Sequence, residues 1–174
     1  MEPKPEQVSS PPGTPLTTLD WADVQTRTAQ ADDYLLATTD ADGRPHVVPV
    51  LAVSLEGTVC FVTFRRSRKT RNLERNKGCA VTVPGGDVDL VIEGTADRVR
   101  DEARLQGVAD LFPAKYPWWH PIVRDGEFYD PADDEPRHVY AVLPAQVFAF
   151  GKEHGFSATR WRFSNERGST ECRR

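Results

Sequence analysis

The sequence has few cysteines and no long hydrophobic segment. Its three cysteines, Cys60, Cys79 and Cys172, are odd in number and widely separated, and no C-x-x-C occurs. This pattern indicates neither a disulfide framework nor a zinc site. No apolar run approaches the length of a membrane span, and the first residues, MEPKPEQVSSPPGTP, lack the apolar centre of a secretory signal. We therefore expect a cytoplasmic protein that has no membrane partner.

An excess of positive charge is also missing. The formal net charge is −4, and the basic residues form one cluster instead of covering a face, which argues against general nucleic-acid binding. The four histidines have no spacing that would gather them as metal ligands. We expect no nucleic-acid partner and no metal site, and a small anionic ligand suits one local cluster of cations better.

The chain length fits a single domain. With 174 residues, of which 39% are hydrophobic, it can form one core. Residues 1–15 contain five of the fourteen prolines and no periodic apolar pattern, so we predict a disordered tail there. We assign the domain to residues 16–163 and a polar C-terminal tail to residues 164–174.

Most of the predicted elements are strands. Short hairpin loops such as Asp40–Gly43 and Glu56–Gly57 are too short for a crossover, so neighbouring strands should be antiparallel. Six or more such strands with a few helices suit a small β-barrel, which leaves no exposed edge. We expect strands at 34–39, 44–55, 59–64, 79–83, 88–99, 138–150 (broken near Pro144) and 157–163, and helices at 18–30 after a Thr cap, just after Ser67, and at 102–112 after Asp101.

A basic turn follows the apolar strand at 59–64. Seven Lys or Arg residues lie between Arg65 and Lys77, with Glu74 as the single acid. Ser67 can cap the following helix, whose first N–H groups lack partners and whose dipole is positive at that end. A hydroxyl, a guanidinium and an ammonium grouped at a helix start can hold a phosphate. A solvated basic loop is the simpler alternative.

The segment at 113–136 is too long for a plain connection. It carries Tyr116, Trp118 and Trp119 between prolines, followed by several acids. Long loops in compact domains are usually lids, binding loops or disordered, and the aromatic residues argue against disorder. This loop either packs across a dimer interface, which is the simpler alternative, or shapes a substrate pocket.

Several motifs occur together in one order along the chain: Pro49-Val50 on an early strand, Ser67-Arg68-Lys69 with Asn72-Leu73 after the next, and Ile92-Glu93-Gly94 on a later one. With these motifs, residues 33–163 resemble the pyridoxamine 5'-phosphate oxidase-like split-barrel family of flavin and deazaflavin oxidoreductases. The resemblance implies a mainly β fold, an antiparallel split β-barrel, and a homodimer with the cofactor at its interface.

The resemblance also implies roles for individual residues. Arg68 and Lys69 would hold the cofactor phosphate, with Ser67 and Asn72 assisting. Asp89 and Trp161 would reach the cofactor ring from the partner subunit. Tyr116 and Trp119 are candidates for stacking on a planar substrate. The ring would be lined by Val47, Val48, Pro49, Val50, Val62 and Thr63.

The chain departs from the family's namesake at two places. The oxidase that makes pyridoxal phosphate typically has Gln where Asp89 stands, and Arg-x-His where this chain has Trp161-Arg162-Phe163. We therefore do not expect pyridoxal-phosphate synthesis. The expected activity is hydride transfer between a flavin-type cofactor and a small, planar, unsaturated organic substrate, with the chemistry supplied by the cofactor.

Two questions stay open at this stage. The surplus of cations slightly favours the deazaflavin coenzyme F-420, with its polyglutamate tail, over FMN. The alternatives to an enzyme are a non-catalytic protein that sequesters a flavin or haem, and an interaction or stress protein with a vestigial phosphate site.

Overall fold

The computed structural model describes residues 5–9, 12, 19–152 and 157–163. No helix in these ranges is both long and apolar enough to cross a membrane. The described helices are α1 (Trp21–Gln30), α2 (Arg68–Arg75) and α3 (Glu102–Lys115), and the described strands are β1 (Pro5–Ser9), β2 (Leu35–Thr39), β3 (Pro45–Pro49), β4 (Ala52–Leu55), β5 (Thr58–Phe64), β6 (Gly78–Val83), β7 (Val88–Arg98), β8 (Ile122–Arg124), β9 (Glu127–Tyr129), β10 (Pro136–Gly151) and β11 (Ser157–Arg162).

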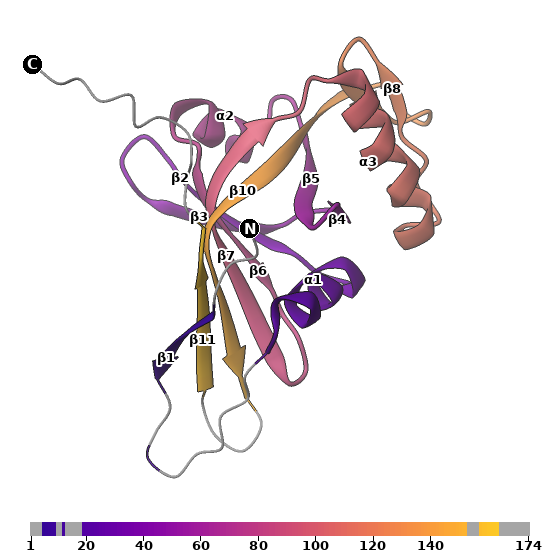
Figure 1. Ribbon diagram of the computed structural model, residues 1–174. Coiled ribbons are helices and arrows are strands. Elements are labelled where there is room, and N and C mark those ends of the chain that lie inside the picture. Colours follow the sequence, from indigo (N-terminus) through magenta and orange to yellow (C-terminus); the bar gives the residue numbers. More distant parts are fainter. Residues whose placement is uncertain (1–4, 10–11, 13–18, 153–156, 164–174) are drawn as a thin grey trace, which may run out of the picture.

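One antiparallel sheet contains all of these strands, and β10 is its central member. Seven strands follow the order β1-β11-β10-β7-β6-β2-β3, while β5 with β4, and β9 with β8, pair with the first half of β10. Figure 1 shows β10 passing through the whole molecule as one long orange strand. The predicted fold class, a mainly β antiparallel split barrel, is confirmed.

The predicted strand at 44–55 is two strands. After Pro49 the chain changes neighbours, because Val50 N donates to Tyr34 O on the β2 side and Leu51 O accepts from Val62 N on β5. Proline has no N–H with which to continue the ladder. The interruption turns β3 away from β4 and brings the residues between them to a boundary of the sheet.

The predicted break near Pro144 is wrong. β10 continues through it as a single strand, with a register shift between Pro144 and Gln146 opposite β7. A β-bulge at this point accommodates the missing N–H of the proline. The facing residue is Gly94, where an added Cβ would lie 2.0 Å from Leu143 O, so the close approach of the two strands requires glycine.

The first residues and the start of the first helix also differ from expectation. Residues 5–9 form β1 and pair with β11, so the disordered tail is wrong for these five residues. Their only proline stands at the first strand position, where it is tolerated.

Helix α1 starts at Trp21, and its cap is Asp20 instead of a Thr. The side chain of Asp20 accepts a hydrogen bond from Asp23 N at 2.7 Å. Apart from residue 12, the other predicted tail residues, including 164–174, lie outside the described residues.

The loop predicted at 113–136 is partly regular. Helix α3 continues through Pro113 to Lys115, and β8 and β9 form a short hairpin further on. Pro113 has no N–H for the helical hydrogen bonds, and only two more helical residues follow it before α3 ends. The segment therefore brings aromatic and acidic side chains to fixed positions beside β10.

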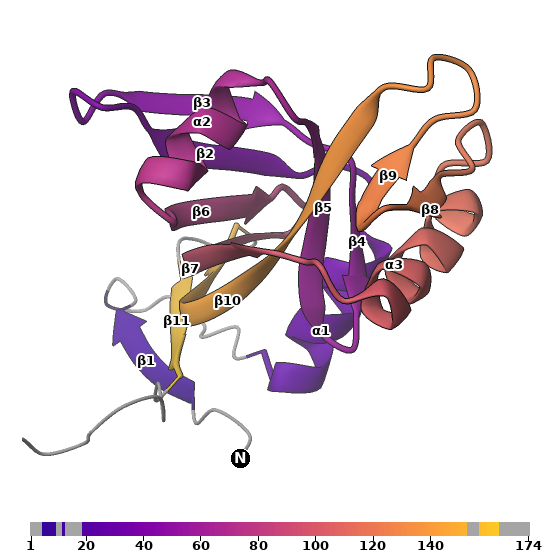
Figure 2. The ribbon, with the colours of Figure 1, turned by 90° about the horizontal axis from the view of Figure 1, so that it is seen from above.

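The buried side chains form two cores. The first lies against α1 and strands β2, β6, β7, β10 and β11, and includes Leu36, Val81 and Trp161. The second lies under α3, against β4, β5, β9 and the first half of β10, and includes Leu105 and Phe112. Figure 2 shows α2 over β2 and β3 at one side, and α3 beside β4 and β8 at the other.

Candidate functional site

The start of α2 is fixed to the end of β5 by hydroxyl groups. Ser67 Oγ accepts from Thr70 N at 3.2 Å and lies 2.8 Å from Thr63 Oγ1, while Thr70 Oγ1 donates to Phe64 O at 2.9 Å. Ser67 is therefore the helix cap that the sequence predicts. The first N–H groups of α2 have no partner inside the helix, and they carry the positive end of its dipole.

The two cations of the Ser-Arg-Lys motif have different environments. Arg68 Nη2 lies 2.9 Å from Asp40 Oδ2. The backbone N–H of Arg44, together with Arg68, holds the pKa of Asp40 below its usual value. Lys69 has no hydrogen-bond or ion-pair partner among the described residues, and burial lowers its pKa. A half-buried ammonium without a partner loses part of its hydration and gains no hydrogen bond in exchange. Of the two cations, Lys69 is therefore the one that can bind an anion.

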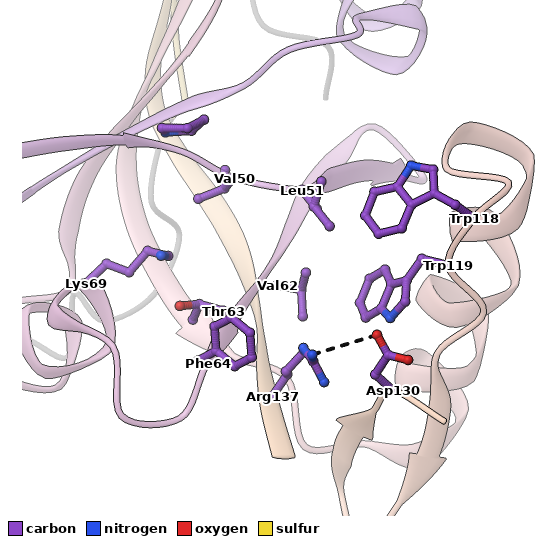
Figure 3. A pocket seen from close by; sticks show the side chains of 11 residues that line it. Val50, Leu51, Val62, Thr63, Phe64, Lys69, Trp118, Trp119, Asp130 and Arg137 are labelled. Carbon is purple, nitrogen blue, oxygen red and sulfur yellow. Dashed lines mark ion pairs between the residues drawn. The ribbon is translucent and has the colours of Figure 1, made fainter. Parts of the chain in front are cut away.

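A cavity of about 280 Å³ opens beside Lys69. Figure 3 shows Lys69 at one side of it and the two tryptophans at the opposite side, with Val50, Leu51 and Val62 between them. The cavity thus has a cationic end, an apolar middle and an aromatic end. Its lining residues are Pro49, Val50, Leu51, Val62, Thr63, Phe64, Lys69, Trp118, Trp119, Asp130 and Arg137.

The aromatic end is built around a buried arginine. Arg137 donates from Nη1 and Nη2 to the two carboxylate oxygens of Asp133, at 3.1 and 2.6 Å, and this contact holds the pKa of Asp133 below its usual value. The guanidinium lies 4.5 Å from the centre of the Phe64 ring and 5.9 Å from that of Trp119. Its charge is therefore already balanced before any ligand arrives.

The two tryptophans differ in exposure. Trp119 is 3% exposed and packs edge-on against Phe112, with ring centres 4.8 Å apart. Trp118 is 69% exposed. A buried indole held by other rings is a rigid wall, whereas an exposed one offers its faces to a ligand. Of this pair, Trp118 is thus better placed to stack on a planar molecule.

Six of the predicted site residues line the cavity together. They are Pro49, Val50, Val62, Thr63, Lys69 and Trp119, and Ser67 adjoins them through Thr63. Sequence reasoning missed Leu51, Phe64, Trp118, Asp130 and Arg137 as lining residues. Trp118 shared the aromatic signal that selected Trp119, but Asp130 and Arg137 carry no local signal, since the sheet pairing of β9 and β10 brings them together.

Other predicted residues lie elsewhere. Asn72 is buried and donates to Thr38 Oγ1 at 2.9 Å, so it ties α2 to β2. Tyr116 uses its hydroxyl on the backbone of Ala52, donating to its O at 3.1 Å and accepting from its N at 3.2 Å. Tyr116 therefore supports the cavity wall from behind instead of facing a substrate.

The residues proposed to act across subunits are also away from the cavity. Asp89 Oδ1 lies 2.8 Å from Lys152 Nζ and accepts from Gly85 N. Trp161 is fully buried in the first core, where its ring centre is 5.8 Å from that of Trp21. It has no surface left to offer to a partner, because the packing of β11 against α1 encloses it. Val47 and Val48 lie on β3, and Val47 is 58% exposed.

A buried cluster of charged groups lies beside the site. Glu127 Oε1 is 2.9 Å from His138 Nε2 and 2.7 Å from Arg98 Nη2. Burial lowers the pKa of His138, and the neighbouring Arg98 adds to this effect. His138 pairs with Thr63 across β5 and β10, so the cluster links β9 to the strand that carries the cavity wall. Among the described residues, no group of three or more His, Cys, Asp or Glu side chains could hold a metal ion.

Comparison with known proteins gives a family match. A family model described as Pyridoxamine 5'-phosphate oxidase matches residues 23–151. No curated protein matches the chain. Many solved structures share the fold.

Three of these structures differ in what their names say they bind. A pyridoxamine 5'-phosphate oxidase-related, FMN binding protein from Nostoc punctiforme is 16% identical with a TM-score of 0.57, and the match covers 87% of this chain and 95% of that one. An F-420 reductase is 22% identical with a TM-score of 0.52, covering 71% of this chain and 94% of that one. A haem binding protein from Mycobacterium smegmatis is 16% identical with a TM-score of 0.58, covering 82% of this chain and 59% of that one. At these identities the likeness shows the fold alone.

Proposed function

The chain belongs to the pyridoxamine 5'-phosphate oxidase family, and on this premise we propose that it binds a flavin-type cofactor and acts as an oxidoreductase. Its reaction would transfer a hydride between that cofactor and a small, planar, unsaturated organic compound. The family includes flavin-dependent oxidoreductases, and the cavity described above is the site to which we assign this activity.

One observation carries the proposal. Lys69 presents a half-buried ammonium, with no partner among the residues that the structure describes, to an apolar cavity next to the serine-capped start of a helix. A phosphate there would gain a charge-assisted hydrogen bond from Lys69 and the free N–H groups of α2, and would offset the cost of burying the cation. The apolar middle of the cavity suits a planar ring attached to that phosphate.

The residues present fit a flavin-type group. Lys69 and the hydroxyls of Ser67 and Thr63 would hold its phosphate, and Pro49, Val50 and Val62 would contact its ring. When bound, the cofactor supplies the hydride chemistry. The chain's own residues bind and orient it, and Trp118 covers the cavity on the side away from Lys69. Arg68 would assist only after its contact with Asp40 is released.

Haem is a poorer fit for this cavity. None of the lining residues is a His, Cys, Met or Tyr, the usual axial ligands of haem iron. His138 lies close by but points into the charged cluster with Glu127. We therefore favour the flavin-type cofactor over haem sequestration.

The identity of the cofactor is a finer question. Of the seven cations in the basic turn, Arg65, Arg68 and Lys77 lie within 4.0 Å of a carboxylate. The surplus charge that favoured coenzyme F-420 is therefore smaller than the sequence suggests, and FMN and F-420 should be tested side by side. We also propose that the cofactor binds at the interface of a homodimer. The exposed Val47 on the edge strand β3 supports this arrangement.

Ligand titration tests the proposal. The purified protein is titrated with FMN and with F-420, following the fluorescence of each, and the same is done for Lys69→Ala. Loss of one charge-assisted contact to a phosphate should weaken binding about tenfold or more. The matched control is Lys77→Ala, which removes the same charge from the same basic turn, but at an exposed position that pairs with Asp97.

Three results would contradict the proposal or narrow it. If neither cofactor binds the wild-type protein, the oxidoreductase assignment is wrong. If Lys69→Ala and Lys77→Ala weaken binding equally, the cavity is not the phosphate site. If a cofactor binds tightly but the protein passes no hydride to any planar unsaturated acceptor, the non-catalytic alternative takes its place.

A further inference from the structure

The aromatic end of the cavity contains a buried hydrogen-bond donor with no acceptor. Trp119 is 3% exposed, yet its Nε1 has no hydrogen-bond partner among the described residues. Leaving such a donor unpaired is costly, so native proteins rarely do so without a reason. The indole cannot turn away to find water, because Phe112, Phe128 and Arg137 surround it.

An acceptor with unused capacity lies at the same end. Asp130 Oδ1 accepts from Ala132 N at 2.9 Å, whereas Oδ2 lies 3.7 Å from Arg137 Nη2, beyond hydrogen-bond distance. Arg137 cannot come closer without giving up its two bonds to Asp133. Figure 3 shows the nitrogen of Trp119 on the edge of the ring that faces the Asp130 carboxylate. A donor and an acceptor thus stand next to each other on the cavity wall.

We propose that Trp119 and Asp130 recognise a cis-amide edge, meaning an N–H adjacent to a C=O in a planar ring. Trp119 Nε1 donates to the carbonyl oxygen, and Asp130 accepts from the ring N–H. This inference rests on the proposed function, because the pyrimidine ring of both FMN and F-420 has such an edge. It places that edge of the cofactor at the end of the cavity away from Lys69.

The charges at this end support the assignment. Asp133 neutralises Arg137, which leaves Asp130 as the carboxylate with an open oxygen. A second anionic group of a ligand would meet Asp130 and would have to displace Asp133 from a bidentate contact. A neutral edge that offers one donor and one acceptor satisfies both open groups and displaces nothing.

A pair of ligands tests this without any change to the protein. FMN is compared with its N3-methyl derivative, which keeps the phosphate and the ring but lacks the ring N–H. Because a hydrogen bond to a charged group is worth more than a neutral one, methylation should weaken binding to the wild-type protein about tenfold or more. In Asp130→Ala the two ligands should bind with nearly equal affinity. Asp134→Ala, which removes an exposed acid nearby, should preserve the wild-type difference.

A spectroscopic measurement tests the donor. The chain has four tryptophans, so a protein labelled with ¹⁵N should give four indole N–H signals, and the one lost in Trp119→Phe belongs to Trp119. Binding of FMN should move that signal downfield as its proton enters a hydrogen bond. Trp119→Phe keeps an aromatic ring in place but should weaken FMN binding by about two- to tenfold.

The outcomes separate this inference from the proposed function. If FMN binds in a Lys69-dependent way, but N3-methylation has no effect and the Trp119 signal does not move, the cis-amide edge is wrong and the flavin site stands. If neither FMN nor F-420 binds at all, both proposals are overturned.

Discussion

The two ends of the cavity are built in different ways. Thr63, Ser67 and Lys69, at the cationic end, lie within seven consecutive residues, and a strand end followed by a capped helix places them. At the aromatic end, Trp119 follows α3, and Asp130 and Arg137 lie on either side of the loop between β9 and β10. The first end depends on local geometry, so its charge can be changed without disturbing the fold. The second depends on the core under α3, so its shape and the protein's stability should change together.

Removing the support of the aromatic end should have the largest effect. Phe112 is fully buried and its ring contacts those of Tyr116, Trp119 and Phe128. Phe112→Ala leaves a cavity in the second core and should lower the free energy of unfolding by about 3–5 kcal/mol, measured by chemical denaturation. Phe64→Ala, at a 44% exposed ring of the same cavity, should cost clearly less. Equal losses would mean that the aromatic end does not depend on the core.

Acid should also lower stability, through the buried charged cluster beside the cavity. The pKa of His138 is lowered in the folded protein, chiefly by burial and also by Arg98, and its carboxylate partner is Glu127, with Arg65 near the same carboxylate. As pH falls below about 6.5, His138 takes up a proton in the unfolded chain but not yet in the folded protein. Stability therefore falls until the pH reaches the lower pKa that His138 has in the folded protein.

Melting temperatures from pH 7.5 down to 5 check this expectation. His138→Gln should show a shallower loss of stability with acid than the wild-type protein, and the exposed His120→Gln serves as the control. If His138→Gln and the wild-type protein lose stability in parallel, the buried histidine is not responsible.

The smallest effect should come from freeing the second cation of the motif. Asp40→Asn removes the charge that engages Arg68, which can then turn toward a phosphate beside Lys69. Because exposed ion pairs are weak, the affinity for FMN should rise by at most about fivefold in titration. The gain should vanish in the double variant Asp40→Asn, Arg68→Ala. A gain that persists there would come from lower overall negative charge instead of from Arg68.

The sequence by itself determined the antiparallel mainly β fold and the cationic end of the site. Alternation of apolar and polar residues, short hairpin loops and a serine at a helix start act over a few residues, so they can be read directly from the chain. Ser67 as the cap and Lys69 as a cavity cation follow from those local rules.

Only the tertiary structure decided which of these residues can still bind a ligand and which side chains lie opposite them. Arg68 and Lys69 are adjacent, but Asp40, which lies far away in sequence, pairs with Arg68 and not with Lys69. The split between β3 and β4, the continuity of β10 through Pro144 and the enclosure of Trp161 depend on which strand or helix lies alongside. Such contacts are set by sheet register and by packing across the core, and no local pattern of residues specifies either.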